Sequence, residues 1–200
     1  MTNLYDTLFN NNEQEPINDI ALEIINQLHG HVDFNCISEY HDITSYNKLF
    51  SEEQRNLSVM HMNARSLPKN FDKITVFLNS LVMSPDIIAI TETWLNDTNK
   101  YLFQLPGYHP HHLTRQTRTH GGVTLFISND IHSEPIDTLT IINDDIEILT
   151  IKINVNSVSY YICAIYRPHS KHERVKEFSN ILNTLLLSDT VNKKKNNNCR

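Results

Sequence analysis

This chain of 200 residues has few cysteines, no long apolar run and no excess of basic residues, and each shortage excludes a class of protein. Its cysteines, Cys36, Cys163 and Cys199, are odd in number and far apart, which argues against a disulfide framework or a CxxC zinc site and indicates a reducing, intracellular compartment, nuclear or cytoplasmic. No apolar run approaches the roughly 20 residues that span a bilayer. The first residues also lack the apolar region of a secretory signal, so we expect no membrane partner.

Basic residues are outnumbered by acidic ones: 17 Lys and Arg stand against 23 Asp and Glu, a net charge of −6. Domains that act on phosphate backbones usually carry a basic excess. The net charge therefore argues mildly against a nucleic-acid partner. What the sequence does contain, 40% hydrophobic and 20% charged residues, is ordinary globular usage and predicts one folded core.

Hydrophobic periodicity predicts a mixed order of strands and helices. Strand-type patterns occur at 57–63, 86–90, 121–128, 146–155 and 158–166. Helix-type patterns occur at 16–29, at 71–82 and, after the capping box of Ser170–Glu173, up to about residue 187. The dipeptide Asn156-Ser157 predicts a tight turn between the last two strands, and 31–56, which has no clean period, is interpreted as a linker. The pattern indicates an α/β fold with helices outside the sheets.

Two oxygen-bearing side chains stand where apolar strands run out. Asn63 ends the first predicted strand, and Glu92 follows "DIIAIT" ahead of the only tryptophan. Strand ends are where ligands meet side chains in layered α/β folds, and carboxylate and amide oxygens suit Mg²⁺. The alternative is that Glu92 caps the following turn and Asn63 opens a loop. Spacing alone leaves both interpretations open.

Four motifs in order resemble a known family: "MNARSLPKNFDKI", "DIIAITETWL", "GGVTLFI" and "AIYRPH". They are similar to the first half of the endonuclease/exonuclease/phosphatase superfamily, and more closely to the apurinic-type endonuclease domain that opens the reverse-transcriptase reading frame of LINE-type non-LTR retrotransposons. The resemblance implies an α/β (α+β) fold, an incomplete four-layer α/β-β/α sandwich. It divides the chain into a leader with a short helix and linker at 1–56, the domain at 57–187 and a disordered Lys/Asn-rich tail at 188–200.

The resemblance also implies roles for three residues in DNA phosphodiester hydrolysis. Asn63 matches the asparagine that helps bind metal and phosphate, Glu92 matches the principal Mg²⁺ ligand, and Tyr166 matches the tyrosine that hydrogen-bonds the scissile phosphate. Arg118 and Arg167 are candidates for contact with the DNA backbone. Arg118 would share a phosphate-tracking stripe with Arg115, although such residues are as readily a solvated face.

The sequence departs from the family at two points. No G-D-x-N motif follows the last predicted helix and no S-D-H motif follows it, although these motifs supply the water-orienting Asp, a stabilising Asn and an Asp-His pair in the family. We therefore expect a truncated domain that holds Mg²⁺ weakly or not at all and is inactive alone. The stretch "RTHGGV" also has His120 where the family's longer glycine run continues.

A second hypothesis of another class is a non-catalytic relic that acts as a binding or interaction module. The segments "DIIAI", "TLFIS" and "YYICAIY" combine β-branched and aromatic residues with no internal charge, and they favour self-association through an exposed sheet edge. The histidine-rich "HPHH" at His109–His112 is interpreted as a solvated loop and not as a metal cluster, because Pro110 breaks regular strand pairing.

Overall fold

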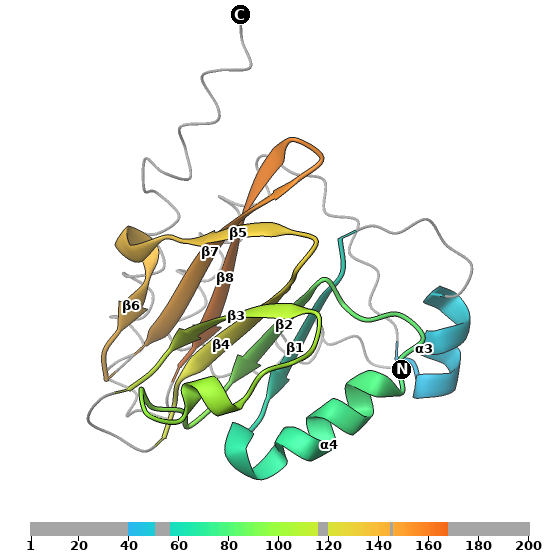
Figure 1. Cartoon of the computed structure of the whole chain (residues 1–200), viewed down its shortest axis with the longest axis horizontal. Helices are drawn as coiled ribbons and strands as arrows, with labels where there is room; N and C mark the ends of the chain where they lie inside the picture. Colours follow the sequence, from blue (N-terminus) through green and yellow to red (C-terminus); the bar gives the residue numbers. More distant parts are fainter. Residues whose placement is uncertain (1–39, 51–56, 116–119, 145, 168–200) are drawn as a thin grey trace, which may run out of the picture. The chain divides into compact units, whose positions relative to one another are not determined.

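The computed structural model describes residues 40–50, 57–115, 120–144 and 146–167. All of them belong to one compact unit, Tyr40–Phe178. The helices predicted at 16–29 and after Ser170, and the tail at 188–200, lie outside the described residues. The elements in chain order are α3 (Ile43–Phe50), β1 (Val59–Asn63), α4 (Leu67–Asn79), β2 (Ile87–Thr91), η1 (Lys100–Leu102), β3 (Tyr108–Leu113), β4 (Val123–Ser128), β5 (His132–Pro135), η2 (Asp137–Leu139), β6 (Ile141–Ile142), β7 (Glu147–Val155) and β8 (Val158–Tyr166) (Figure 1).

The first sheet, sheet A, has the strand order β1-β2-β4-β3. β1 and β2 are parallel and are joined through α4, as the predicted order of strand, helix and strand requires. β4 is antiparallel to both β2 and β3. All five residues of β2 are buried, which agrees with a strand that is apolar on both faces.

The second sheet, sheet B, has the order β5-β7-β6, and β8 also pairs with β7. β7 and β8 form a long antiparallel hairpin that runs from Glu147 opposite Tyr166 to Val155 opposite Val158. Its turn residues, Asn156 and Ser157, have φ of 49° and 65°, the left-handed conformation at both positions that a two-residue hairpin turn favours. The predicted tight turn is confirmed.

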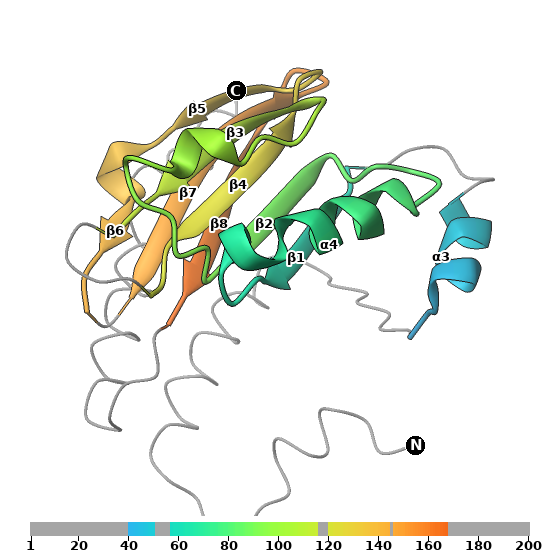
Figure 2. The ribbon, with the colours of Figure 1, turned by 60° about the horizontal axis from the view of Figure 1, so that its bottom comes forward.

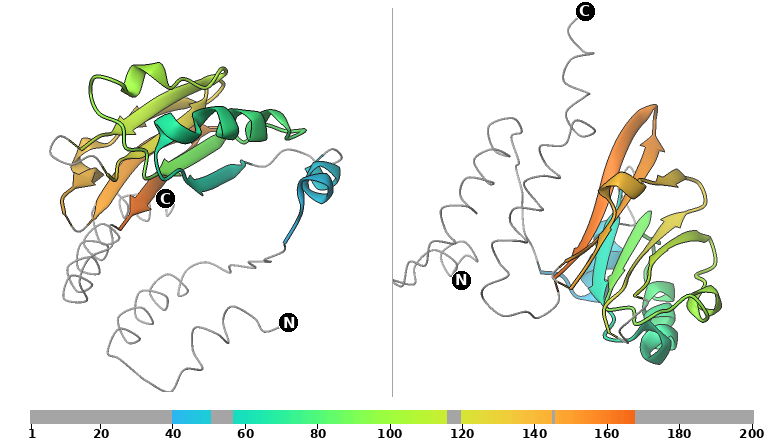
Figure 3. Two further views of the ribbon diagram at one scale, coloured as in Figure 1. Left: turned by 90° about the horizontal axis from the view of Figure 1, so that it is seen from below. Right: turned by 90° about the vertical axis from the view of Figure 1, so that its left-hand side faces the viewer.

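Two apolar cores hold three layers together. One core lies between the sheets and joins Ile87, Leu125 and Ile127 of sheet A to Ile151 and Ile153 of sheet B. The other lies on the opposite face of sheet A, where α4 and the segment leading to β3 cover β2 and β4. The right-hand view of Figure 3 shows α4, sheet A and sheet B in succession. The fold is thus mixed α/β with two sheets, as predicted, while the helix that would supply the fourth layer falls outside the described residues.

Two segments differ from the prediction. "HPHH" is not a loop: it lies in β3, the edge strand of sheet A, where Pro110 is tolerated because an edge strand has one side without a partner. Residues 43–50, predicted to be linker, form α3, whose first turn is capped by Asp42 through a 2.7 Å bond from the Ser45 N–H. Asn47 ties α3 to the turn after α4, because its amide bonds both the Ser80 carbonyl (2.9 Å) and the Val82 N–H (2.8 Å).

β3 carries two half-buried histidines, one on each face of sheet A. His111 Nε2 lies 2.9 Å from Ser133 Oγ on β5, and His112 Nδ1 lies 3.0 Å from Thr124 Oγ1 on β4. Burial is the main reason that the pKa of each is lowered to about 4, and the charge of a neighbouring group, His109 or Lys100, adds to it. Both imidazoles are therefore neutral in the folded protein at pH 7.

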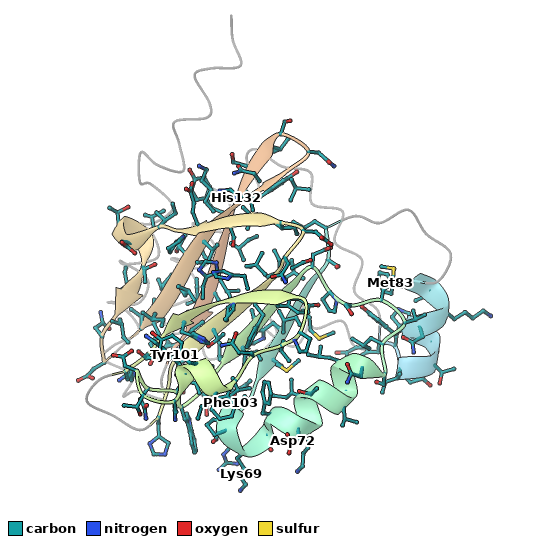
Figure 4. All side chains as sticks on the ribbon, viewed as in Figure 1. Lys69, Asp72, Met83, Tyr101, Phe103 and His132 are labelled. Atoms are coloured by element: carbon teal, nitrogen blue, oxygen red, sulfur yellow. The ribbon has the colours of Figure 1, made fainter. Side chains whose placement is uncertain are left out.

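Lowering the pH from about 6.5 to about 4 is expected to destabilise the fold by about 1–2 kcal/mol through these two groups, after allowance for solvent screening. Between these pH values the two histidines are protonated in the unfolded chain but neutral in the folded protein. The free energy of unfolding therefore falls as the pH is lowered. Urea unfolding at pH 7.0, 5.5 and 4.5 measures the effect. His112→Gln should flatten the pH dependence, whereas His132→Gln, at an exposed position on β5 (Figure 4), should leave it unchanged. An unchanged slope for His112→Gln would contradict the assignment.

Candidate active site

The three residues singled out from the sequence lie together where strands end. Asn63 is the last residue of β1, Glu92 follows the last residue of β2, and Tyr166 is the last residue of β8. These strands end on the same side of the two sheets (Figure 2). Asn63 Nδ2 donates a 2.8 Å hydrogen bond to Glu92 Oε1, and the Tyr166 phenol lies near enough to the Glu92 carboxylate for that carboxylate to raise the pKa of the phenol. Glu92 is therefore the centre of the cluster.

The backbone at this end is held in unusual conformations. Glu92 has φ of 53° and Trp94 has φ of 56°, both left-handed for non-glycine residues. Such residues cost roughly 1–3 kcal/mol each and persist only where the surroundings enforce them. The β1–α4 connection does so here, since the Ser66 N–H bonds the Glu92 carbonyl and the Leu67 N–H bonds the Thr93 carbonyl, both at 2.9 Å. Arg65 and Ser66 of that connection also have positive φ, so strained backbone from two segments meets at Glu92.

Tyr166 is set to donate a hydrogen bond. Burial raises the pKa of Tyr166 to about 12, and the adjacent Glu92 carboxylate adds to this shift. At neutral pH the phenol keeps its proton, because ionising it would place a second negative charge beside Glu92. The side chain can therefore act as a neutral donor at this site, and not as an anion.

A pair of glycines fixes the segment after Glu92. The Thr93 N–H bonds the Gly122 carbonyl at 3.2 Å, and the Trp94 N–H bonds the Gly121 carbonyl at 2.8 Å. Both glycines have positive φ, and a Cβ on Gly122 would stand 2.5 Å from Thr93 Oγ1. Only glycine fits at this point, so the shorter glycine run noted in "RTHGGV" still supplies the close approach that the loop needs.

Gly122→Ala is expected to lower the free energy of unfolding by about 2–4 kcal/mol, since it adds backbone strain and a clash with Thr93. Gly107→Ala is a matched control, because Gly107 has φ of 86° against 85° for Gly122 but nothing within 4 Å of its added Cβ. Chemical unfolding of both variants separates strain from the clash. Equal losses at the two positions would show that contact between Gly122 and Thr93 does not matter.

Behind the glycines lies a buried ion pair that the sequence did not reveal. Glu147, at the start of β7, is 0% exposed, and Arg115 is 8% exposed. Glu147 Oε1 accepts a hydrogen bond from Arg115 Nε, and Glu147 Oε2 accepts one from the Gly122 N–H at 2.6 Å. Arg115 Nη2 also donates to the Asn143 carbonyl at 2.7 Å. Arg115 is thus not part of a phosphate-tracking stripe, because its guanidinium is turned inward to neutralise Glu147.

The other basic candidates lie at the edge of the site or outside the description. Arg167 is exposed and directly follows Tyr166, so it is close to the cluster in sequence and accessible to a ligand. Arg118 lies outside the described residues. Lys69, on the first turns of α4, projects away from the sheets (Figure 4). Trp94 lies on the other flank, with its ring 4.4 Å from that of His120 in an edge-to-face contact.

The donor set fits a hard cation that keeps most of its water. Within 40–50, 57–115, 120–144 and 146–167, no group of three or more His, Cys, Asp or Glu side chains is arranged to hold a metal ion. Mg²⁺ needs less, since it is commonly bound through one or two carboxylates with water and substrate phosphate in its other positions. Glu92 supplies the carboxylate. Asn63 donates to Glu92 and accepts at Oδ1 from the Arg65 N–H (3.0 Å), so in this arrangement it orients Glu92.

Comparisons with known proteins bear on the fold. No model of a protein family matches, and no curated protein matches. Among solved structures, the chain is similar to the endonuclease domain of TRAS1, a telomere-specific non-LTR retrotransposon, at 14% identity and a TM-score of 0.43 over 60% of this chain and 52% of that one. It is similar to a humanized D. rerio TDP2 at 15% identity and a TM-score of 0.47 (65% and 58%). A third is the 3′ phosphatase NExo from Neisseria bound to a product DNA hairpin, at 18% and 0.34 (53% and 40%).

The chain spans about half the length of these solved structures, namely 52%, 58% and 40%. The roles of individual residues in this chain rest on the geometry described above. None of the helices in the described ranges is long and apolar enough to cross a membrane.

Proposed function

We propose that this chain is a Mg²⁺-dependent DNA phosphodiester hydrolysis domain of the retrotransposon endonuclease type. The observation that supports it most is the cluster of Asn63, Glu92 and Tyr166, which joins a carboxylate, an amide and a protonated phenol at one end of the two sheets. The four ordered motifs give the same assignment. The net charge of −6 argues mildly against a DNA partner, and the proposal assigns the local contact with phosphate to the metal ion, Arg167 and Arg118.

Each residue of the cluster has a distinct part in this proposal. Glu92 holds Mg²⁺, which when bound neutralises charge on the phosphate and the leaving oxygen. Asn63 orients the Glu92 carboxylate through its 2.8 Å hydrogen bond. Tyr166 donates a hydrogen bond from its phenol to a phosphate oxygen, and the pKa of about 12 keeps the phenol protonated at neutral pH. Arg167 and Arg118 contact the DNA backbone.

We propose that these 200 residues by themselves bind Mg²⁺ and DNA but hydrolyse DNA slowly or not at all. Their sequence holds no G-D-x-N or S-D-H motif after the "YRP" strand. The groups that orient and deprotonate water in the resembled family are therefore not supplied by these residues, and each such group is commonly worth about 10²-fold or more in rate. Mg²⁺ binding needs only the residues already in the cluster.

A binding and nicking assay tests the function. Wild type should bind a short duplex more tightly with Mg²⁺ than with EDTA, and should nick supercoiled plasmid slowly or not at all. Glu92→Ala should lose the Mg²⁺-dependent part of the binding and any nicking, while Asp130→Asn, an exposed acid in the turn between β4 and β5, should lose neither. Binding that responds neither to Mg²⁺ nor to Glu92 would contradict the proposal.

The alternative, a non-catalytic interaction module, is favoured by one observation. In the described part of the chain, β1 pairs only with β2, and Val59 on this edge strand is 56% exposed. Such an edge can accept another strand, so we propose it as the route of self-association. Light scattering of the wild type and of Val59→Lys tests it: association that persists in the variant would exclude this edge.

A location inside the cell, nuclear or cytoplasmic, belongs to the same proposal. Cys163 on β8 is an exposed free thiol, and the cysteines of the whole chain are odd in number. A reducing compartment keeps such a thiol from forming disulfides with other molecules.

A further inference from the structure

The buried pair of Arg115 and Glu147 adjoins the candidate site through the backbone. Glu147 is a fully buried carboxylate, and both of its oxygens are used, one by Arg115 and one by the Gly122 N–H. The same glycine presents its carbonyl to the Thr93 N–H, directly after Glu92. Hydrogen bonds to the backbone of the glycine pair therefore link Glu147 to Thr93 and Trp94, the two residues that directly follow the candidate metal ligand Glu92.

The second glycine closes this arrangement from the other side. Gly121 accepts from the Trp94 N–H at 2.8 Å, and a Cβ on Gly121 would stand 2.3 Å from Glu147 Oε1 and 2.9 Å from Arg115 Nε. The ion pair thus fills the space against the glycine backbone. Any change in its shape or charge must move the two peptides that hold Thr93 and Trp94.

We propose that the Arg115–Glu147 ion pair is a positioning device for Glu92, holding the Gly121–Gly122 backbone in the place from which it fixes the left-handed turn at Glu92 and Trp94. This inference rests on the proposed function for the role of Glu92. Arg115 and Glu147 are positioning residues, since neither is exposed to a ligand. Such a device is needed because the Glu92 backbone is strained: a residue at φ of 53° stays there only while neighbouring groups enforce that conformation.

The location of the pair argues against a purely structural role. Burying two charges is unfavourable unless every polar atom is satisfied, and apolar side chains would stabilise a sheet at least as well. Another ion pair on sheet B, Lys152–Glu134, is only partly buried and joins the paired strands β5 and β7 at 2.6 Å. The buried pair, which has the larger desolvation cost, lies instead at the end of β7 nearest the site.

The two glutamates provide a matched comparison in the full chain. Glu147→Gln removes the buried charge and sets an amide against the Gly122 N–H, whereas Glu134→Gln makes the same chemical change on the surface. Trp94 is the only tryptophan in the sequence, so its fluorescence reports the turn after Glu92 without a label. Mn²⁺ affinity, followed by the electron paramagnetic resonance of free Mn²⁺ with Mg²⁺ as competitor, reports the metal ligand itself.

Glu147→Gln is expected to shift the Trp94 emission and to weaken Mn²⁺ binding by about tenfold, the size typical of a lost supporting contact at a metal site. Glu134→Gln should change neither. Arg115→Lys, which keeps the charge but loses part of the guanidinium's hydrogen bonding, should fall between them. A folded Glu147→Gln protein with wild-type emission and wild-type Mn²⁺ affinity would overturn the proposal.

The proposal remains testable if Glu147→Gln does not fold or if wild type binds no Mn²⁺. If Glu147→Gln does not fold, Arg115→Lys takes its place, and wild-type emission and affinity in that variant overturn the inference. If wild type itself binds no Mn²⁺, the proposed function fails, but Trp94 emission still tests positioning: a shift in Glu147→Gln and none in Glu134→Gln supports it, and no shift in either overturns it.

Discussion

Replacing Arg115 with methionine is expected to lower the free energy of unfolding by about 3–5 kcal/mol. The substitution leaves Glu147, which is 0% exposed, with the Gly122 N–H as its remaining hydrogen-bond donor among those described for the pair. A buried carboxylate without a counter-charge must either stay ionised at high cost or take up a proton. Urea unfolding at pH 7 measures the loss.

A double variant separates the pair's charge from its packing. Arg115→Met combined with Glu147→Leu removes both charges and should recover a large part of the stability, because an apolar pair of similar volume avoids the desolvation cost. Lys152→Met, which breaks the exposed pair with Glu134, should have no measurable effect. A double variant as unstable as Arg115→Met alone would mean that the guanidinium acts through packing.

Glu92→Gln is expected to weaken Mg²⁺ or Mn²⁺ binding by about 100-fold or more while the protein remains folded. The amide keeps the size of the side chain but removes the only carboxylate in the cluster, and loss of even a supporting contact at a metal site commonly costs 10- to 100-fold. Isothermal titration with Mn²⁺ measures the affinity. Asp130→Asn serves as the matched control, since it removes one exposed negative charge elsewhere.

The stability of Glu92→Gln should change little. The amide keeps an oxygen that can accept the hydrogen bond from Asn63, so the unfolding midpoint should be nearly unchanged or slightly raised. A variant that binds metal as well as wild type would show that Glu92 only orders the turn, the interpretation that spacing alone left open.

Much of this architecture follows from local pattern. After Asp86, the run Ile87–Ile90 is apolar in every position, as expected of a strand covered on both faces, and β2 is such a strand. Asn63 and Glu92 could be placed together in advance because parallel strands end at the same edge of a sheet. The ends of β1 and β2 were therefore predictable from sequence.

The remaining features depend on partners distant in sequence. Glu147 begins a strand that also contains Thr150, Lys152 and Asn154, so it resembles a surface position until Arg115, 32 residues earlier, is known to face it. Pro110 argued against a strand, but sheet position decides that question, and β3 lies at an edge. α3 has the apolar residues Ile43, Tyr46 and Phe50 at helical spacing, but it is short and none of its residues is buried. A cap from Asp42 and the contacts of Asn47 with the turn after α4 hold it in place.

The most direct test of the site is paramagnetic line broadening in isotopically labelled protein. Sub-stoichiometric Mn²⁺ broadens signals near the ion, and the side-chain amide of Asn63 and the indole N–H of Trp94 provide resolved reporters on two sides of Glu92. We expect both to broaden first in wild type, to recover when Mg²⁺ is added in excess, and to stay sharp in Glu92→Gln. Broadening that begins at acidic residues elsewhere, or that persists at Asn63 in Glu92→Gln, would contradict a metal site centred on Glu92.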